Sequence, residues 1–335
     1  MLERKINVNI FLRNPNKLGN FSLEIFYNEL YKDLNNQMNI NIIKVPFKSQ
    51  GILNRSFNII FCFLNQTDIN HIVGDITYCS LLMRKSNLII TILDCISLYK
   101  NNVIKKKILK YFLFSMPVNK ASKIITISEA TKNDLERFLN KKIQNCHTIP
   151  VAVSSSFFNQ KLKKKKSKFN YRYLMIGTAP NKNIERVSKA LEGVRGELNI
   201  IGKLNNSQKA QLLKSKINFK EHAYALTEEE LINQYRLSDI LIFPSTLEGF
   251  GMPIIEANLI GVCVITSNIS SMPHVSNNAA FLVDPFDVES IKAGILKIIN
   301  DKSFRESLIL NGHKNAKRFE IQKVARQHKE LYNQI

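Results

Sequence analysis

The chain has 335 residues, of which 44% are hydrophobic and 22% are charged. This composition excludes wholesale disorder, and the length suffices for two compact domains that each bury a core. The formal net charge is +21, so we expect an anionic partner such as nucleic acid, a phosphorylated ligand or a membrane surface. Lysine, asparagine and isoleucine are all abundant, so an equally good explanation is a compositional bias in which part of the positive charge has no function.

Neither the amino terminus nor the cysteines indicate an exported protein. No apolar run resembles a signal peptide, and none approaches the ~20 residues needed to span a bilayer. The five cysteines contain no Cys-x-x-Cys pair, which argues against a zinc site and against a disulfide framework. We therefore expect a cytoplasmic protein whose cysteines are packing residues.

Strand-like runs alternate with helical periods in the first half of the chain, which predicts βα units. The predicted strands are Ile6–Phe11, Asn58–Phe63, Leu88–Ile92 and Lys123–Ile127. Ser128 follows the last of these and precedes a helical pattern, so we expect it to cap that helix.

A run of lysines, Lys161–Lys168, lies between the two halves. Like charges repel and stay solvated, so we interpret this run as a linker rather than a nucleic-acid contact. We expect an N-terminal domain over residues 1–160, a C-terminal domain over 161–315, and a helix over 316–335 that crosses back to the first domain.

The second half repeats the alternation and predicts a second Rossmann-like domain. Helices are expected from Ile184, over Thr227–Leu237, from Pro253, and throughout the chain from Val288 onward. The predicted strands are Tyr171–Ile176, Leu198–Ile201, Ile240–Phe243 and Val262–Thr266.

The most informative segment runs from Phe243 to Ala257. A buried strand is expected to end at Phe243, and Pro253 suits the first position of a helix. The loop between them carries Glu248, and we expect Glu256 in the first helical turn. Helix amides at the end of a parallel strand form an anion site, and carboxylates accept paired hydroxyl groups. For either glutamate alone, solvation of Glu248 or the helix dipole at Glu256 is the better explanation, but the whole string predicts a ligand combining phosphate with sugar.

Two lysines are expected at the same end of the sheet. Lys182 and Lys203 each follow a predicted strand, so their ammonium groups can offset the charge of a leaving diphosphate. For Lys203, a merely solvated side chain is an equally good interpretation. The sequence contains no Asp-x-Asp metal motif, and we expect no metal or other cofactor.

The string from Glu248 to Glu256 resembles the E-x7-E motif of the family 4 glycosyltransferases. The similarity extends through Leu174–Arg186 and Asp284-Pro285. The resemblance implies an α/β fold of the GT-B type, with two Rossmann-like domains facing each other across a cleft. It also implies a donor-binding C-terminal domain, an acceptor-binding N-terminal domain, and transfer with retention of configuration.

The resemblance further implies roles for single residues. Glu256 would hold the ribose hydroxyls, Glu248 would contact the transferred sugar, and Lys182 would contact the diphosphate. In the first domain, Gly19 would approach the donor phosphates. The backbone lining the sugar and phosphate would be that of Gly249, Phe250, Gly251 and Met252.

Two positions of the chain depart from the pattern of this family. Thr178 stands where the family often has an arginine that contacts phosphate, so one donor contact is missing or moved. Leu93 stands where a histidine often lies near the sugar, which leaves the sugar and the activity open. Elsewhere in the first domain, His71 is expected to be a packed or capping histidine rather than a base.

A segment of the first domain combines lysines with apolar residues. Ile104–Phe114 is expected to form a helix that is basic on one side and apolar on the other. Such a helix either lies on an anionic membrane or is a core helix with a solvated face.

Together these features predict a retaining hexosyltransferase that takes its sugar from a nucleoside diphosphate. The expected acceptor is a saccharide or lipid-linked saccharide in surface polysaccharide assembly. The expected location is cytoplasmic, with a peripheral position on the inner face of the plasma membrane and without nucleic acid as a partner. Alternatives are a GT-B epimerase or phosphorylase, or a degenerate glycosyltransferase acting as a binding scaffold.

Overall fold

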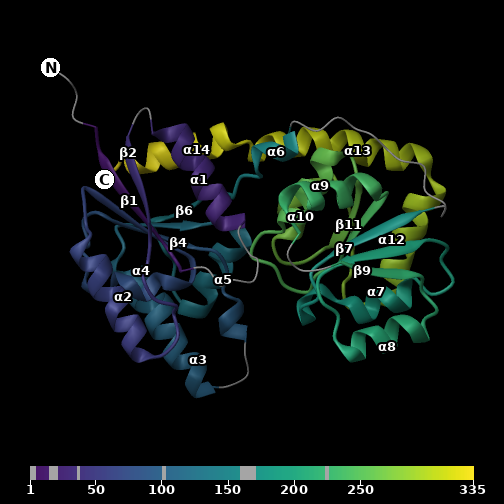
Figure 1. The fold of residues 1–335 in the computed structure, drawn as a ribbon, viewed down its shortest axis with the longest axis horizontal. Coiled ribbons are helices and arrows are strands. Elements are labelled where there is room, and N and C mark those ends of the chain that lie inside the picture. Colours follow the sequence, from purple (N-terminus) through teal and green to yellow (C-terminus); the bar gives the residue numbers. More distant parts are fainter. Residues whose placement is uncertain (1–4, 15–21, 36–37, 100–102, 159–170, 223–225) are drawn as a thin grey trace. The chain divides into compact units, whose positions relative to one another are not determined.

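The computed structural model describes residues 5–14, 22–35, 38–99, 103–158, 171–222 and 226–335 (Figure 1). The chain forms two compact units, of which unit 1 is Met1–Ser154 with Glu320–Ile335 and unit 2 is Ser155–Phe319. The predicted linker Lys161–Lys168 and Gly19 lie outside the described residues. Among the residues described, no helix has the length and apolar character needed to cross a membrane.

Unit 1 is built on a six-stranded parallel sheet in the order β2-β1-β3-β4-β5-β6. The central strands are buried on both faces, as parallel strands covered by helices must be. The strands are β1 (Asn7–Leu12), β2 (Asn39–Lys44), β3 (Ile69–Val73), β4 (Leu88–Ile92), β5 (Lys123–Thr126) and β6 (Cys146–Thr148).

Helices cover both faces of this first sheet (Figure 1). On one face α1 (Ser22–Leu34) packs against α14 (Ile321–Tyr332). Right-handed crossovers place the remaining elements on the other face, where most of them share one core with the strands. These elements are α2 (Ile52–Leu64), η1 (Gly74–Leu82), η2 (Ile96–Tyr99), α3 (Val103–Lys110), η3 (Tyr111–Ser115), α4 (Met116–Lys120) and α5 (Glu129–Leu139).

His71 ties α14 to the sheet of unit 1. The ring is fully buried on β3, with Nδ1 2.9 Å from the Tyr332 hydroxyl and Nε2 2.6 Å from Oγ1 of Thr91. Burial lowers the pKa of His71 well below its usual value, so the ring stays neutral. The prediction of a packed histidine is therefore confirmed.

The predicted strand Asn58–Phe63 is wrong, because these residues lie inside α2. The run is rich in isoleucine and phenylalanine, and a short apolar run does not distinguish a strand from a helix. Strands β2, β3 and β6 were not predicted, since each is short and interrupted by polar residues.

Unit 2 is a second parallel sheet in the order β12-β11-β10-β7-β8-β9. Chain order reverses between β7 and β10, which is the position where open α/β sheets bind ligands. The strands are β7 (Arg172–Ile176), β8 (Glu197–Ile201), β9 (Phe219–His222), β10 (Ile240–Phe243), β11 (Cys263–Ser267) and β12 (Phe281–Val283).

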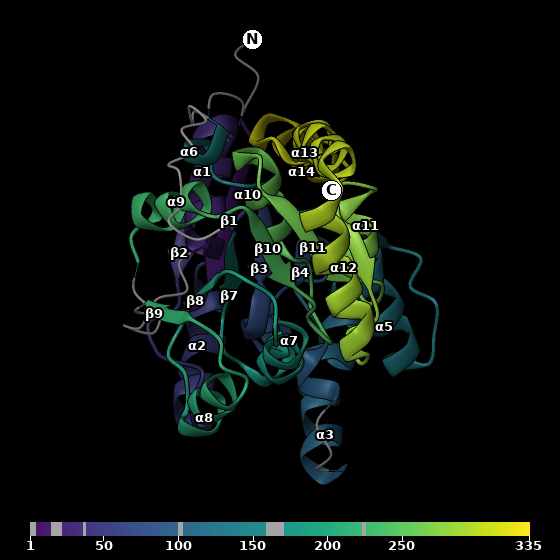
Figure 2. The same cartoon turned by 90° about the vertical axis from the view of Figure 1, so that its right-hand side faces the viewer.

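The helices of unit 2 also lie on both faces of their sheet. α7 (Ile184–Ala190) contacts α12 (Val288–Asn300), and Figure 2 shows these two side by side. On the other face α10 (Met252–Ile260) contacts α9 (Glu228–Leu237) and α13 (Lys302–Ala316). The other helical elements of unit 2 are α6 (Ser155–Phe158), η4 (Pro180–Lys182), α8 (Asn206–Lys214), α11 (Met272–Ser276) and η5 (Lys317–Phe319).

Helix ends follow the capping signals in the sequence. Ser128 caps α5 by accepting a hydrogen bond from the Thr131 amide, as predicted. α10 begins at Met252, so Pro253 takes the second helical position rather than the first. Glu256 consequently lies in the second turn of α10, which corrects the expectation of the first turn.

Both units are Rossmann-like, and the predicted α/β class is confirmed. The expectation that the two domains face each other across a cleft stays a prediction.

Candidate active site

Two loops meet at the carboxyl edge of the second sheet, where chain order reverses. β7 and β10 are paired neighbours, so the segments that follow them leave the sheet side by side. The amide of Thr246, after β10, donates to the carbonyl of Asn181, after β7, at 2.9 Å. The sheet therefore brings the two predicted motif segments together.

An ion pair joins these two loops. Nζ of Lys182 lies 2.6 Å from Oε1 of Glu248, and the side chains are 18% and 14% exposed. The ammonium also lies 4.7 Å from the centre of the Phe243 ring, within range of a cation–π contact. Gly177 has φ +89°, and a Cβ there would come within 2.9 Å of the Lys182 side chain. Glycine thus leaves the space through which Lys182 reaches Glu248.

Asn183 fastens the loop after β7. It has φ +65° and is buried, and its amide nitrogen donates to the carbonyls of Pro244 and Pro285. Three loops at the carboxyl edge are therefore held by one side chain.

Two serines hold the loop that carries Glu248. The Ser270 hydroxyl donates to the Glu248 carbonyl at 2.7 Å, and the Ser271 hydroxyl donates to the Phe250 carbonyl at 2.6 Å. Backbone groups held in this way keep the loop in one conformation without using the Glu248 carboxylate. That carboxylate remains directed at Lys182 and Asn181.

Glu256 is a buried carboxyl on the same side of β10. The hydroxyl of Tyr235, on α9, donates to Oε2 of Glu256 at 2.6 Å. Burial raises the pKa of Glu256 to about 7, although the hydrogen bond from Tyr235 opposes this rise. The carboxyl is therefore poised to change its charge when a ligand supplies further hydrogen bonds.

The start of α10 depends on Gly251, which has φ +111°. Phe250 is buried, and its ring lies 5.6 Å from that of Phe319. The Phe250 side chain is therefore used in packing, and the ligand contact predicted for the backbone of Gly249–Met252 stays a prediction.

Thr178 and Lys203 lie at the ends of the neighbouring strands β7 and β8. The Thr178 hydroxyl donates to the Lys203 carbonyl at 2.8 Å, so its hydrogen is already used within the protein. Lys203 itself is exposed, and its charge contributes to lowering the pKa of Glu221. The roles predicted for these two residues stay predictions.

Sequence reasoning did not identify Tyr235, Asn183, Ser270 or Ser271 as parts of this site. Asn183 lies within the motif segment, and its place directly after Lys182 was an available signal. The others come from separate elements, and nothing in their local sequence points to Glu248 or Glu256.

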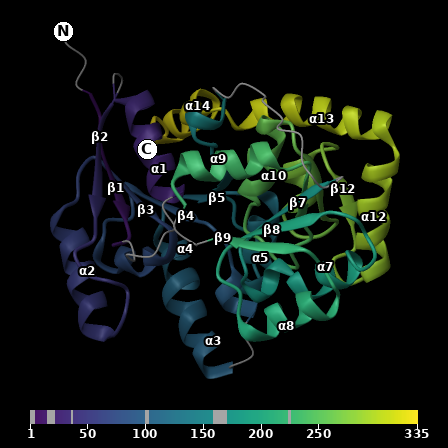
Figure 3. The ribbon, with the colours of Figure 1, turned by 45° about the vertical axis from the view of Figure 1, so that its right-hand side comes forward.

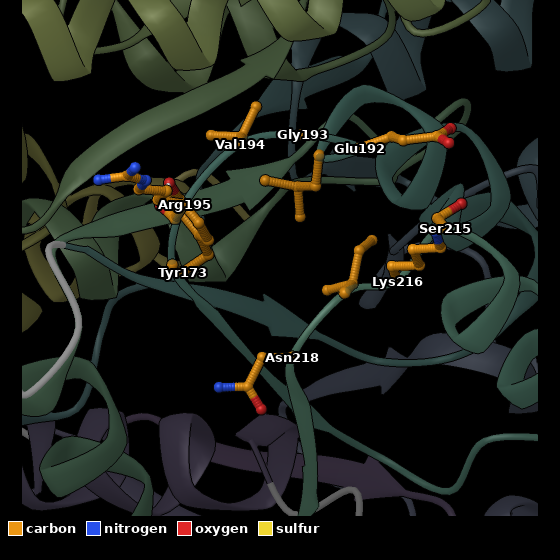
Figure 4. Close-up of a pocket in the computed structure, with 11 residues that line it drawn as sticks. Tyr173, Glu192, Gly193, Val194, Arg195, Ser215, Lys216 and Asn218 are labelled. Atoms are coloured by element: carbon orange, nitrogen blue, oxygen red, sulfur yellow. The ribbon is translucent and has the colours of Figure 1, made fainter.

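A pocket of about 410 Å³ lies at the opposite end of the second sheet, where the strands begin (Figure 4). Its lining includes Tyr173, Arg195, Lys216 and Asn218, from the amino ends of β7 to β9 and the segments before them. It is therefore separate from the Lys182–Glu248 pair, which lies beyond the carboxyl ends. Among the described residues, no three His, Cys, Asp or Glu side chains group together in a way that could hold a metal.

The family model of glycosyl transferases group 1 matches residues 156–315. The match covers 160 of the 335 residues, so this segment is similar to the glycosyl transferases of group 1. It contains the Lys182–Glu248 pair and Glu256, and membership of family 4 is consistent with the match.

Two curated relatives are similar to most of the chain. An O-antigen chain mannosyltransferase of Escherichia coli is 29% identical over 226 residues, covering 60% of this chain and 58% of that protein. An O-antigen chain mannosyltransferase of Salmonella typhimurium is 30% identical over 219 residues, covering 63% and 61%. The alignments thus span about three fifths of the length of these relatives.

Solved structures establish the fold over the whole chain. Sucrose-phosphate synthase from Thermosynechococcus elongatus has a TM-score of 0.76 at 14% identity and covers 99% of both chains. The Anabaena protein HepE, solved with UDP and glucose, has a TM-score of 0.75 at 14% identity and covers 98% of this chain and 100% of that one. The chain therefore has the GT-B glycosyltransferase fold.

Proposed function

We propose that this chain transfers a hexose from a nucleoside diphosphate sugar to a saccharide or lipid-linked saccharide, in the assembly of a surface polysaccharide. Mannose is the first candidate for the sugar, because two relatives are named O-antigen chain mannosyltransferases. The observation that carries the proposal is the Lys182–Glu248 pair at the point where chain order reverses in the second sheet.

The donor's parts match the groups along this edge. Glu256, with one oxygen held by Tyr235, accepts hydrogen bonds from the ribose hydroxyls. Glu248 accepts hydroxyls of the transferred sugar, and Lys182 turns its ammonium toward the diphosphate. The amides at the start of α10 add positive potential at the same place.

The chemistry requires little from acid–base side chains. The bond between the anomeric carbon and the diphosphate oxygen breaks, and the acceptor oxygen bonds to that carbon on the same face. The acceptor proton passes to the leaving phosphate oxygen, and Lys182 offsets the charge that develops on the diphosphate. This route accounts for retention of configuration without a dedicated base.

The test has a binding arm and a transfer arm. Calorimetry with GDP and UDP measures nucleotide affinity, and GDP-mannose and UDP-glucose serve as donor probes for transfer to mannosides. We expect Lys182→Ala to abolish transfer, whereas Lys189→Ala, on the exposed side of α7, leaves it intact.

Three results would contradict the proposal. Nucleotide binding without transfer from any donor would favour a scaffold. Interconversion of the donor sugar would favour an epimerase, and phosphate-dependent release of sugar from a saccharide would favour a phosphorylase. Transfer with inverted configuration would contradict the retaining mechanism alone.

A further inference from the structure

Helix α2 of unit 1 is apolar on two sides, because Cys62 is buried in the core of the unit while other apolar residues face outward. Its inner side carries Asn58, which is fully buried and bonds both the Phe47 backbone and the Tyr78 hydroxyl. Its outer side carries Leu53, Phe57, Ile60 and Leu64, which are between 48% and 75% exposed. A helix of a water-soluble domain normally turns its apolar stripe inward. The exposed stripe of α2 therefore requires a partner.

Helix α3 and the start of η3 carry a second exposed apolar stripe. Ile104, Ile108 and Tyr111 recur at helical spacing and are between 55% and 75% exposed. Lys106 instead lies against the Phe138 ring, with Nζ 5.3 Å from the ring centre. Of the lysine side chains of α3 that the structure describes, only that of Lys107 is exposed. Ile104, Ile108 and Tyr111 are thus not core residues, whereas Phe114 at the end of the segment is buried in the core of unit 1.

The two stripes lie in the same layer. α2 contacts η1, η1 contacts η3 and α4, and η3 continues α3, all on one face of the first sheet. Figure 3 shows α2 and α3 beyond the same side of the strands of unit 1. Leu81 and Leu82, at the end of η1, are exposed as well.

The two elements that carry the exposed stripes, α2 and α3, have only basic charged residues. α2 and the segment 103–115 of α3 and η3 contain five lysines and arginines and no aspartate or glutamate, whereas Asp75 in η1 and three acidic residues of α5 lie in the same layer. Arg55 on α2 and Lys107 and Lys110 in the last turn of α3 lie beside the apolar stripes. Exposed apolar side chains combined with basic and no acidic residues are typical of helices that lie in the interface of anionic bilayers.

We propose that the face of unit 1 formed by α2 and α3 docks on an anionic lipid bilayer. The apolar stripes enter the boundary between headgroups and acyl chains, and the basic residues contact the phosphates of the headgroups. Nucleic acid would use the lysines but not the apolar stripes. A second copy of this chain would bring a face of equal positive charge, which opposes self-association.

Two variants test the surface, each with a matched control in unit 2. Phe57→Ser with Ile60→Ser removes the α2 stripe, and Leu213→Ser with Leu310→Ser changes equally exposed apolar residues elsewhere. The charge variant is Lys107→Glu with Lys110→Glu. Its control is Lys189→Glu with Lys214→Glu, which are also in last turns of helices.

The measurement is flotation with phosphatidylcholine vesicles, with and without about one third phosphatidylglycerol, at about 0.1 M and about 1 M salt. We expect wild type to float with the anionic vesicles, and each test variant to reduce the bound fraction on the order of tenfold. Both controls should bind as wild type does, and all variants should keep their nucleotide affinity.

Several results would overturn the inference. One is a wild-type chain that binds neither kind of vesicle, and another is equal binding to neutral and anionic vesicles. Equal losses in test and control variants would indicate a diffuse charge effect. A wild-type dimer in light scattering that Phe57→Ser with Ile60→Ser dissociates, without vesicle binding, would assign the face to a second copy. Because nucleotide calorimetry is independent of flotation, failure here leaves the proposed transferase activity unaffected.

Discussion

The Tyr235→Phe substitution tests the proposed ribose contact through its dependence on pH. Phenylalanine keeps the ring of Tyr235, which packs 6.0 Å from that of Phe157, and removes only the hydroxyl that donates to Glu256 at 2.6 Å. Besides burial, two described groups affect the pKa of Glu256. The hydrogen bond from Tyr235 lowers this pKa, and the charge of Glu228 raises it. The substitution therefore removes the one interaction that favours the ionised form of Glu256.

The sign of the effect follows from the pKa. Burial raises the pKa of Glu256 from 4.5 to about 7, so the ionised carboxyl destabilises the fold. This cost is absent below about pH 4.5 and complete above about pH 7. A hydrogen bond to a charged group contributes about 1.5–3 kcal/mol, and 1.36 kcal/mol corresponds to one pKa unit. Tyr235→Phe should therefore raise the pKa of Glu256 further, by roughly one or more.

Nucleotide binding should report this change. If the ribose hydroxyls donate to the carboxylate, binding favours ionised Glu256 and releases a proton near neutral pH. Affinity should then fall below about pH 7 in wild type. In Tyr235→Phe it should be on the order of tenfold weaker at pH 7 and recover toward about pH 9.

The assay is calorimetry with GDP and UDP over this pH range, in two buffers with different ionisation enthalpies so that proton release is counted. Tyr173→Phe is the control, since Tyr173 is equally buried but donates to the Arg195 carbonyl at the other edge of the sheet. Unchanged affinity of Tyr235→Phe at every pH, or binding without proton release in wild type, would refute the reasoning.

Three further predictions concern the same edge of the sheet. Glu256→Ala should weaken nucleotide binding by about 1–3 kcal/mol without lowering the melting temperature, and unchanged affinity by calorimetry would exclude the ribose contact. Transfer should survive EDTA but not Lys182→Ala; complete loss with EDTA and rescue by manganese would contradict the site. Asn183→Gly should lower the free energy of unfolding because two buried hydrogen bonds are lost, and Asn183→Ala should lower it by about 1 kcal/mol more because of its left-handed φ. Urea denaturation measures the Asn183 difference, and equal values would show that its backbone is not strained.

Local signals in the sequence predicted much of unit 2. β10 was predicted with its observed bounds, and α9 begins directly after Thr227, whose capping box with Glu230 is formed. Such signals act through hydrogen bonds between residues three positions apart, so they are readable without a tertiary structure. The same reasoning failed for α2, because apolar residues lie on both its inner and its outer side and the run therefore shows no helical period.

The sequence by itself determined the motif string and the residue types that suit a sugar diphosphate, including Glu248, Glu256 and Lys182. Only the tertiary structure decided which groups these residues meet. The order of the strands places the loops after β7 and β10 together and so creates the ion pair. The packing of α9 against α10 places Tyr235 on Glu256. Both contacts join residues at least 21 positions apart, and such pairing depends on strand order and helix packing, which no local pattern encodes.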